Sequence, residues 1–224
     1  MSRTVLVTGS SRGIGLELCR QLKERGDHVV ATCRRSTDAL SALDVEVLED
    51  VDVSDPASLN LLSIRLMERK IDWLLNNAGI LQSFGLNDLD ANCSVKFKKM
   101  FDVNSLGPLL ATKSLLKHLD RGSKVGLITS RMGSIADNDS GGSYAYRMSK
   151  AAANAAGKSL SIDLKSHGIS VGILHPGYVR TDMTGHNGLM DVDEAVIGLI
   201  ERMDNLNLTN TGSFWHTNGD ILPW

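Results

Sequence analysis

The chain has 224 residues, a length that suits one domain, and its hydrophobic content of 42% is ordinary for a globular protein. A net charge of −2 and an aromatic content of 4% give no basic surface interleaved with aromatic rings. The composition therefore argues against a protein that binds nucleic acid or an anionic membrane.

The cysteines and histidines indicate neither a disulfide framework nor a metal site. The three cysteines are widely spaced, and the six histidines follow no ligand spacing. No charged segment leads into an apolar signal sequence at the start, and no apolar stretch approaches the length of a membrane span. These features predict a cytoplasmic protein with reduced thiols.

The first expected strand, residues 5–8, runs into a glycine-rich turn, Gly9-Ser-Ser-Arg-Gly-Ile-Gly15, and a helix follows it. Glycines let the backbone approach a ligand, and the start of a helix attracts phosphate. An ordinary turn remains an alternative, because the spacing G-x-x-x-G-x-G differs from the dinucleotide fingerprint G-x-G-x-x-G. The place of the turn, at the first strand–helix junction, favours a ligand.

The second expected strand, residues 28–33, is followed by Arg34 and Arg35. In dinucleotide-binding folds an acidic residue at this strand end binds the adenosine ribose, whereas arginine accommodates a 2′-phosphate. No acid is present here, and Arg12 in the glycine turn could add a third positive charge. The pattern favours NADP(H) over NAD(H), with a solvated basic turn as the alternative.

The middle of the chain continues the alternation of strands and helices. Strands are expected at 45–48 and 71–75, with a helix between them from Pro56 to about residue 70. The fourth strand ends in Asn76-Asn-Ala-Gly79, which suits polar ligand contacts and a plain turn equally. A polar loop over 80–92 then leads to a long helix over about 94–119. Asn104 lies among apolar positions of that helix, so it must find hydrogen-bond partners.

A fifth strand, residues 124–129, delivers Ser130 at its end, and a polar loop over 137–143 follows. The next helix carries Tyr146 and Lys150, whose spacing puts both side chains on one face, one turn apart. A fixed ammonium near a phenol favours the phenolate and should lower its pKa. The pair is common by chance and gains weight only if a cofactor and a polar anchor reach the same place.

The last part supplies a sixth strand at 169–174, a helix from residue 192 and a final strand at 212–217. The loop 182–191 suits a lid over a substrate and a plain surface loop equally. Strands alternate with helices throughout, which predicts an α/β fold. We expect a three-layer, Rossmann-type, doubly wound parallel sheet of about seven strands, in a single domain over residues 1–224.

Taken together, these motifs resemble the short-chain dehydrogenase/reductase family over nearly the full chain. The matching stretches are Thr8-Gly-Ser-Ser-Arg-Gly-Ile-Gly15, Asp52-Val53, Asn76-Asn-Ala-Gly79, Asn104, Ser130, Tyr146-x-x-x-Lys150 and Pro176-Gly177 with Thr181. The short length and the Phe-Trp pair near the end look most like the subgroup of C-factor-like proteins and the carbonyl reductase sniffer.

The resemblance implies a catalytic set of Tyr146, Lys150, Ser130 and Asn104. Tyr146 would be the general acid or base, and Lys150 would lower its pKa and bind the nicotinamide ribose. Ser130 would hold the substrate oxygen, and Asn104 would hold a water that links Lys150 to solvent. The residues implied to contact the cofactor are Gly9, Ser11, Arg12, Gly13, Ile14, Gly15, Arg34, Arg35, Asp52, Val53, Asn76, Asn77, Ala78, Gly79, Tyr146, Lys150, Pro176, Gly177, Val179 and Thr181.

The serine assignment departs from the family pattern. In many relatives the serine precedes the tyrosine by about a dozen residues, a spacing that fits Ser134 better than Ser130. We choose Ser130 because it directly ends the fifth strand, which leaves the extra residues in the loop 137–143.

The sequence thus predicts an NADP(H)-dependent oxidoreductase that reduces a small aldehyde, ketone or quinone, or oxidises the alcohol. A dinucleotide-binding sensor with little turnover is the alternative from another class, and a sugar-nucleotide epimerase needs more chain after Thr181. No metal is expected, and the substrate is not readable. Family resemblance implies a homodimer or homotetramer.

Overall fold

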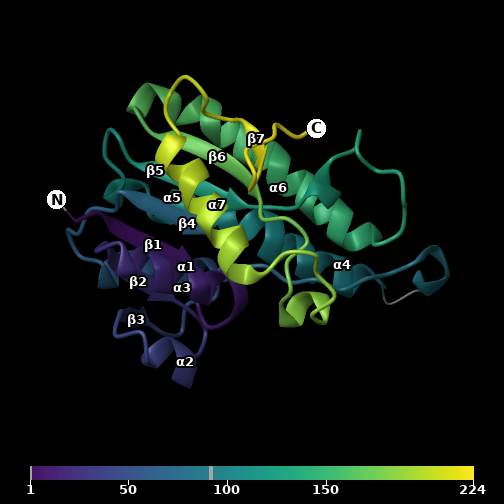
Figure 1. Cartoon of the computed structure of the whole chain (residues 1–224), viewed down its shortest axis with the longest axis horizontal. Coiled ribbons are helices and arrows are strands. Elements are labelled where there is room, and N and C mark those ends of the chain that lie inside the picture. The colour runs from purple at the N-terminus through teal and green to yellow at the C-terminus, as the bar shows by residue number, and fades with distance from the viewer. Residues whose placement is uncertain (1, 91–92) are drawn as a thin grey trace.

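The computed structural model describes residues 2–90 and 93–224, and in these ranges it contains one seven-stranded sheet. The strand order is β3-β2-β1-β4-β5-β6-β7, and every neighbouring pair is parallel. Helices cover both faces of the sheet (Figure 1). The expected doubly wound α/β fold is confirmed.

The element bounds follow the expected alternation. The strands are β1 (Thr4–Thr8), β2 (His28–Thr32), β3 (Glu46–Leu48), β4 (Trp73–Asn76), β5 (Lys124–Ile128), β6 (Ser170–His175) and β7 (Phe214–His216). The α-helices are α1 (Gly13–Glu24), α2 (Asp38–Ser41), α3 (Pro56–Arg65), α4 (Cys93–Phe101), α5 (Gly107–Ser114), α6 (Tyr144–Asp163) and α7 (Val192–Asn205).

Two apolar layers hold the sheet, because successive strand residues point to opposite faces. Val5 and Val7 of β1 pack toward α1 and α7, whereas Leu6 packs toward α3 and α6. All three side chains are fully buried. Burial on both faces explains why these strands read as continuous apolar runs.

The long helix expected over 94–119 is interrupted, which corrects the prediction. Five residues, Asp102–Leu106 (η2), form a π-helical turn between α4 and α5, and a short 3-10 turn follows α5. Pro108 explains the break. It has no N–H to donate to the carbonyl oxygen of Asn104, four residues earlier, and its ring clashes with that carbonyl.

Two smaller differences concern helix ends. The helix from Pro56 ends at Arg65 rather than near residue 70, and Met67 adopts a positive φ of 54° just beyond its end. The short helix α2 was not expected from the sequence. Thr37 caps it by accepting a hydrogen bond from the N–H of Leu40.

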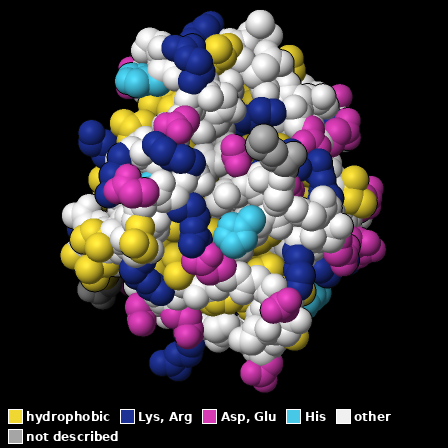
Figure 2. Space-filling view, turned by 90° about the vertical axis from the view of Figure 1, so that its left-hand side faces the viewer, with side chains coloured by type: hydrophobic (Ala, Val, Ile, Leu, Met, Phe, Trp, Pro, Cys, Tyr) yellow, Lys and Arg dark blue, Asp and Glu magenta, His cyan; other side chains and the backbone are white. Residues whose placement is uncertain are grey.

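The carboxyl ends of the strands lie on one side of the molecule, at the right of Figure 1, and they position the candidate site. β1 lies between β2 and β4, so the chain direction across the sheet reverses there, where such folds bind ligands. Figure 2 shows the opposite side, where positive and negative side chains are intermixed. Within the described ranges, no helix combines the length and the apolar character that crossing a membrane requires.

Candidate active site

The glycine-rich turn sits tightly against the end of β4. Gly9 has a φ of +70°, and a Cβ atom on it would come within 2.8 Å of the Cα of Ala78. A Cβ on Gly15 would lie 2.2 Å from the carbonyl oxygen of Gly9. Both positions therefore require glycine, and the turn leaves its backbone open on the cleft side.

Hydrogen bonds of Asn77 and Thr8 hold this turn in place. The Asn77 amide donates to the carbonyl oxygens of Thr8 (2.9 Å) and Gly9 (3.1 Å). The Thr8 hydroxyl accepts from the N–H groups of Asn77 (3.0 Å) and Ala78 (3.1 Å). Because its amide is engaged in this way, Asn77 would support a cofactor site through the turn rather than by its own side chain.

Three arginines border the end of β2 and the glycine turn. Arg12, Arg34 and Arg35 are exposed, and Arg12 reaches Asp182 only at 3.7 Å. Within the described ranges, the guanidinium groups of Arg34 and Arg35 have no hydrogen-bond or ion-pair partner. Arg34 and Arg35 therefore present exposed positive charge here, which suits a phosphate.

Asp52 and Val53 lie at the neighbouring strand end. Burial alone would raise the Asp52 pKa, but hydrogen bonds from Ser54 and the charges of Arg34 and Lys99 outweigh burial and lower it. Asp52 is thus an anion that accepts from the Ser54 N–H at 2.9 Å. Val53 is buried, and a Cβ on Gly107 would lie 3.0 Å from its Cγ2.

Tyr146 and Ser130 meet at the end of β5. Both are 8% exposed. Burial raises the pKa of Tyr146 to about 12, and the nearby Ser130 side chain partly offsets this by favouring the phenolate. Ser130 Oγ also accepts from the N–H of Met132 at 3.1 Å, which leaves the serine hydrogen to be donated.

Lys150 lies beside this pair but does not lower the Tyr146 pKa, contrary to expectation. Its Nζ is 5.7 Å from the Tyr146 ring centroid and donates to the carbonyl oxygen of Ile128 at 3.1 Å. Burial lowers the pKa of Lys150 itself to about 8. Burial therefore dominates the pKa of both groups in this structure.

Asn104 is 2% exposed, and its side chain has the hydrogen-bond partners that a buried amide requires. Its Oδ1 accepts from the N–H of Ile80 at 2.8 Å, and its Nδ2 donates to the Ile80 carbonyl oxygen (2.9 Å) and to Ser149 Oγ (3.0 Å). A Cβ on Gly79 would lie 3.4 Å from Asn104 Oδ1 and 3.6 Å from Lys150 Nζ. The bare glycine thus leaves a space that both polar atoms border.

Ser134 does not join the site, although the spacing in many relatives would have selected it. It is 2% exposed, and its Oγ accepts from the N–H of Asp137 at 3.1 Å. Ser130, by contrast, lies close enough to Tyr146 to lower the pKa of its hydroxyl.

We expect Ser130→Ala to lower kcat by about 10²-fold if Ser130 donates to the substrate oxygen, the role that the family resemblance implies for it. Ser134→Ala is the matched control and should leave kcat unchanged, since it removes only a turn contact. Steady-state kinetics on both variants test this, and the reverse pattern would assign the role to Ser134.

The segment after β6 closes the other side of the cleft. Gly177 has a φ of +91°, Val179 is buried, and a Cβ on Gly13 would lie 3.5 Å from Thr181 Cγ2. The loop 182–191 is pinned at its base, where Val179 bridges Met190 and Arg180 pairs with Asp191 at 2.6 Å. Residues 185–187, farther from this base, are exposed.

Sequence reasoning missed the apolar wall around Tyr146. Tyr146, Ala145, Phe84 and Met100 form a buried cluster, against which four partly buried side chains pack: Ile80, Leu81, Phe97 and Met132. Three members come from the loop that was expected to be polar. Ile80, Leu81 and Phe84 were the available signal, because clustered apolar residues in a loop need a surface to cover.

His175 is a second residue that the sequence did not single out. It is 8% exposed, and its ring meets the His216 ring edge-on at 5.0 Å. Burial, then the charges of His216, Arg131 and Lys150, lower its pKa to about 3, so it stays neutral. Its Nδ1 has no hydrogen-bond partner among the described residues.

The described part of the chain contains neither a metal-binding cluster nor a disulfide. No group of three His, Cys, Asp or Glu residues there could hold a metal ion, and all three cysteines are free.

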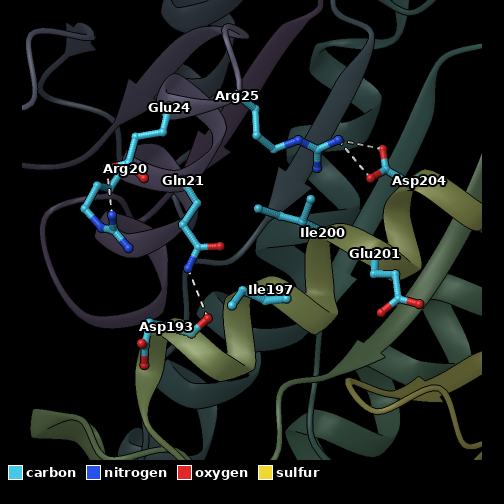
Figure 3. A pocket seen from close by; sticks show the side chains of 9 residues that line it. All are labelled: Arg20, Gln21, Glu24, Arg25, Asp193, Ile197, Ile200, Glu201 and Asp204. Carbon is cyan, nitrogen blue, oxygen red and sulfur yellow. Dashed lines mark hydrogen bonds and ion pairs between the residues drawn. The ribbon is translucent and has the colours of Figure 1, made fainter.

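A groove of about 470 Å³ lies between α1 and α7, on the face of the sheet opposite α6 (Figure 3). Arg25 and Asp204 pair at 2.9 Å across it, far from Tyr146.

Comparison with known proteins identifies the family. The family model described as short chain dehydrogenase matches residues 3–191, so the chain belongs to the short-chain dehydrogenases/reductases. It is 39% identical over 227 residues to a 1-hydroxy-2-glutathionyl-2-methyl-3-butene dehydrogenase of Rhodococcus sp. (strain AD45), covering 99% of both chains. It is 41% identical over 157 residues to the C-signal protein of Myxococcus xanthus, covering 69% of this chain and 93% of that one.

Solved structures agree with this assignment. An NADPH-bound carbonyl reductase from chicken fatty liver superposes with a TM-score of 0.90 at 30% identity, covering 100% of this chain and 99% of that one. The carbonyl reductase Sniffer of D. melanogaster superposes with a TM-score of 0.90 at 28% identity, covering 100% of both. The expected likeness to the C-factor and sniffer subgroup is confirmed, and the chain is an oxidoreductase of this family.

Proposed function

We propose that this oxidoreductase reduces a small aldehyde, ketone or quinone with NADPH and releases the alcohol. The proposal rests on one observation, the burial of Tyr146, Ser130 and Lys150 together, with the Lys150 ammonium 5.7 Å from the Tyr146 ring centroid. These groups stand at the carboxyl ends of the strands, next to the glycine-rich turn. Proton transfer and dinucleotide binding can therefore meet in one cleft.

The residues of the cleft fit a dinucleotide phosphate. The tight turn at Gly9 and Gly15 has no room for side chains, so a pyrophosphate can approach its backbone and the start of α1. Arg34 and Arg35 offer exposed guanidinium groups where a ribose-binding acid would favour NAD. Bound at this site, NADPH would supply the hydride for the carbonyl carbon.

Tyr146 supplies the proton in this proposal. With a pKa of about 12 its hydroxyl is protonated at neutral pH, which suits a general acid for reduction. Ser130 Oγ accepts from the Met132 N–H, so its single hydroxyl hydrogen can be donated to the substrate oxygen and hold that oxygen near Tyr146. Lys150 and Asn104 border the space above Gly79, where a water can restore the proton to the site.

The wall beside Tyr146 favours an apolar group next to the carbonyl. Phe84 belongs to the same buried apolar cluster as Tyr146, and Met132 packs against that cluster. The Rhodococcus relative is named for an alcohol that carries a glutathionyl group. A carbonyl beside a thioether therefore belongs on the substrate panel with simple aldehydes, ketones and quinones.

The test is NADPH consumption against that panel, repeated with NADH and with Tyr146→Phe. Turnover that depends on NADPH and is lost in the variant supports the proposal. Tight NADPH binding without turnover of any panel member contradicts it. That result would favour the second candidate, a dinucleotide-dependent signalling protein, for which the 41% identity to C-signal is the supporting observation.

Cofactor choice provides a separate prediction. We expect Arg34→Ala and Arg35→Ala each to raise the KM for NADPH about tenfold and to leave the KM for NADH nearly unchanged, because each removes a charged hydrogen bond to the 2′-phosphate. Arg121→Ala is the matched control. It removes the same charge just before β5, at the amino ends of the parallel strands, away from the candidate site. Equal effects on both cofactors would contradict an NADP preference.

We also propose that the chain forms a homodimer or homotetramer through α4 and α6. Val95 and Phe101 on α4 and Met148 on α6 are 73%, 42% and 57% exposed. A hollow lined by Phe97, Phe101, Ala145 and Met148 lies between the two helices. Light scattering should give a multiple of 24.2 kDa, and a monomer would contradict the proposal.

A further inference from the structure

The segment that follows Ser130 is wedged between the site and the last residues of the chain. It begins with the 3-10 turn η4 (Arg131–Gly133), whose first N–H groups fold back onto Ser130. A Cβ on Gly133 would come within 2.6 Å of the backbone carbon of Lys150. Any shift of this segment would therefore move Ser130 relative to Lys150 and Tyr146.

Residues 221–224 hold the far side of this segment. The N–H of Ala136 donates to a backbone oxygen of Trp224 at 2.9 Å. The Trp224 ring stacks on Phe214, with centroids 5.5 Å apart and an interplanar angle of 30°. Figure 1 shows this end of the chain beside β7 and near the loop that follows β5.

Residues 221–224 are themselves attached to the sheet through β7. Phe214 belongs to β7 and is 1% exposed, and Leu222 is buried against it and Ile173. The N–H of Leu222 donates to the carbonyl oxygen of Phe214 at 2.8 Å, and Ile221 bridges Trp215. A rigid strand thus carries the ring on which Trp224 rests.

We propose that Trp224 is a positioning residue for the reduction: its ring, stacked on Phe214, holds the backbone that anchors Ala136, and so keeps Ser130 in reach of the substrate oxygen. The inference rests on the proposed function. Ser130 acts directly on the substrate in that function, whereas Trp224 acts only through residues 131–136. Misplacement of a reacting group by about 1 Å can cost ~10²-fold in rate, so a contact this far from the chemistry can matter.

Three variants test the inference. Trp224→Ala removes the stacked ring, and Trp224→Phe retains an aromatic ring that can stack on Phe214. Ile221→Ala changes an exposed side chain of the same segment, 74% exposed, and is the matched control. For each we would measure kcat, KM, NADPH affinity and amide hydrogen exchange across residues 131–137.

We expect Trp224→Ala to lower kcat about tenfold, with KM and NADPH affinity nearly unchanged, and to speed exchange at the Ala136 amide. Trp224→Phe should restore most of kcat, and Ile221→Ala should behave as wild type. Faster exchange with an unchanged kcat would make the contact merely structural and overturn the proposal. Unchanged exchange would also overturn it, because the Trp224 ring would then have no effect on the hydrogen bond of the Ala136 amide.

The exchange measurement separates this inference from the proposed function. If the wild-type protein turns over no carbonyl, the proposed function fails, and the positioning role fails with it. The exchange rates would still show whether Trp224 fixes the segment that carries Ser130. If the wild-type enzyme is active and only the Trp224 result fails, the proposed function stands.

Discussion

Replacing Tyr146 by phenylalanine is expected to lower kcat for carbonyl reduction by about 10²–10⁴-fold, the usual contribution of a positioned proton donor. The change removes only the hydroxyl. The ring keeps its contacts with the apolar cluster around Phe84, and Ser130 keeps the hydrogen bond from the Met132 N–H. Folding and NADPH affinity should therefore remain close to wild type, and the loss should appear in kcat.

The same helix offers a matched control. Tyr144 lies two residues earlier, at the start of α6, and is 36% exposed, so Tyr144→Phe removes a phenol hydroxyl at the edge of the site. We expect its kcat to match wild type. Steady-state rates of NADPH oxidation distinguish the two variants, and a Tyr146→Phe enzyme with normal turnover would exclude Tyr146 as the proton donor.

The sequence predicted the order of elements and the strand ends that carry the site. Strand residues such as Leu74 and Val125 are apolar because helices cover both faces, and this pattern is visible in one dimension. The four-residue spacing of Tyr146 and Lys150 predicted their shared helix face, because such residues lie one turn apart on a helix. Polar residues at the carboxyl ends of such strands, Asn76 and Ser130 among them, then had to lie at one edge of the sheet.

The remaining features depend on contacts between distant segments. The apolar wall from Phe84 forms only when its loop folds over α6, and the stack of Trp224 on Phe214 joins two segments whose pairing no periodicity reveals. The π-helical turn did leave a local signal, since Pro108 stands four residues after Asn104. The high pKa of Tyr146 arises from burial, and burial is a property of the packed molecule.

Lys150 is expected to reduce the stability of the protein that it helps to make active. Burial lowers its pKa to about 8 from an ordinary 10.5, so keeping it charged at neutral pH costs about 3 kcal/mol. Lys150→Met removes this cost and gives up one hydrogen bond to Ile128, worth about 1 kcal/mol. We expect the variant to have a free energy of unfolding about 2 kcal/mol higher at pH 7 and to be almost inactive.

The pH dependence gives the sign of this effect. Below pH 8 Lys150 is protonated in both the folded and the unfolded state, so the full cost of burying the charge is present. Between pH 8 and 10.5 the folded protein has lost that proton while the unfolded chain still binds it. Stability attributable to Lys150 therefore rises with pH across this window. The advantage of Lys150→Met should disappear within it and then reverse slightly, because near pH 10.5 only the lost hydrogen bond to Ile128 remains.

Denaturant titrations of both proteins at pH 7, 9 and 10.5 measure that difference, with Lys158→Met, an exposed position on the same helix, as the control. A destabilised Lys150→Met protein at pH 7 would mean that the ammonium stabilises the fold through its contact with Ile128. The expected result instead indicates that Lys150 is retained for function, since burying its charge costs more than its hydrogen bond to Ile128 contributes.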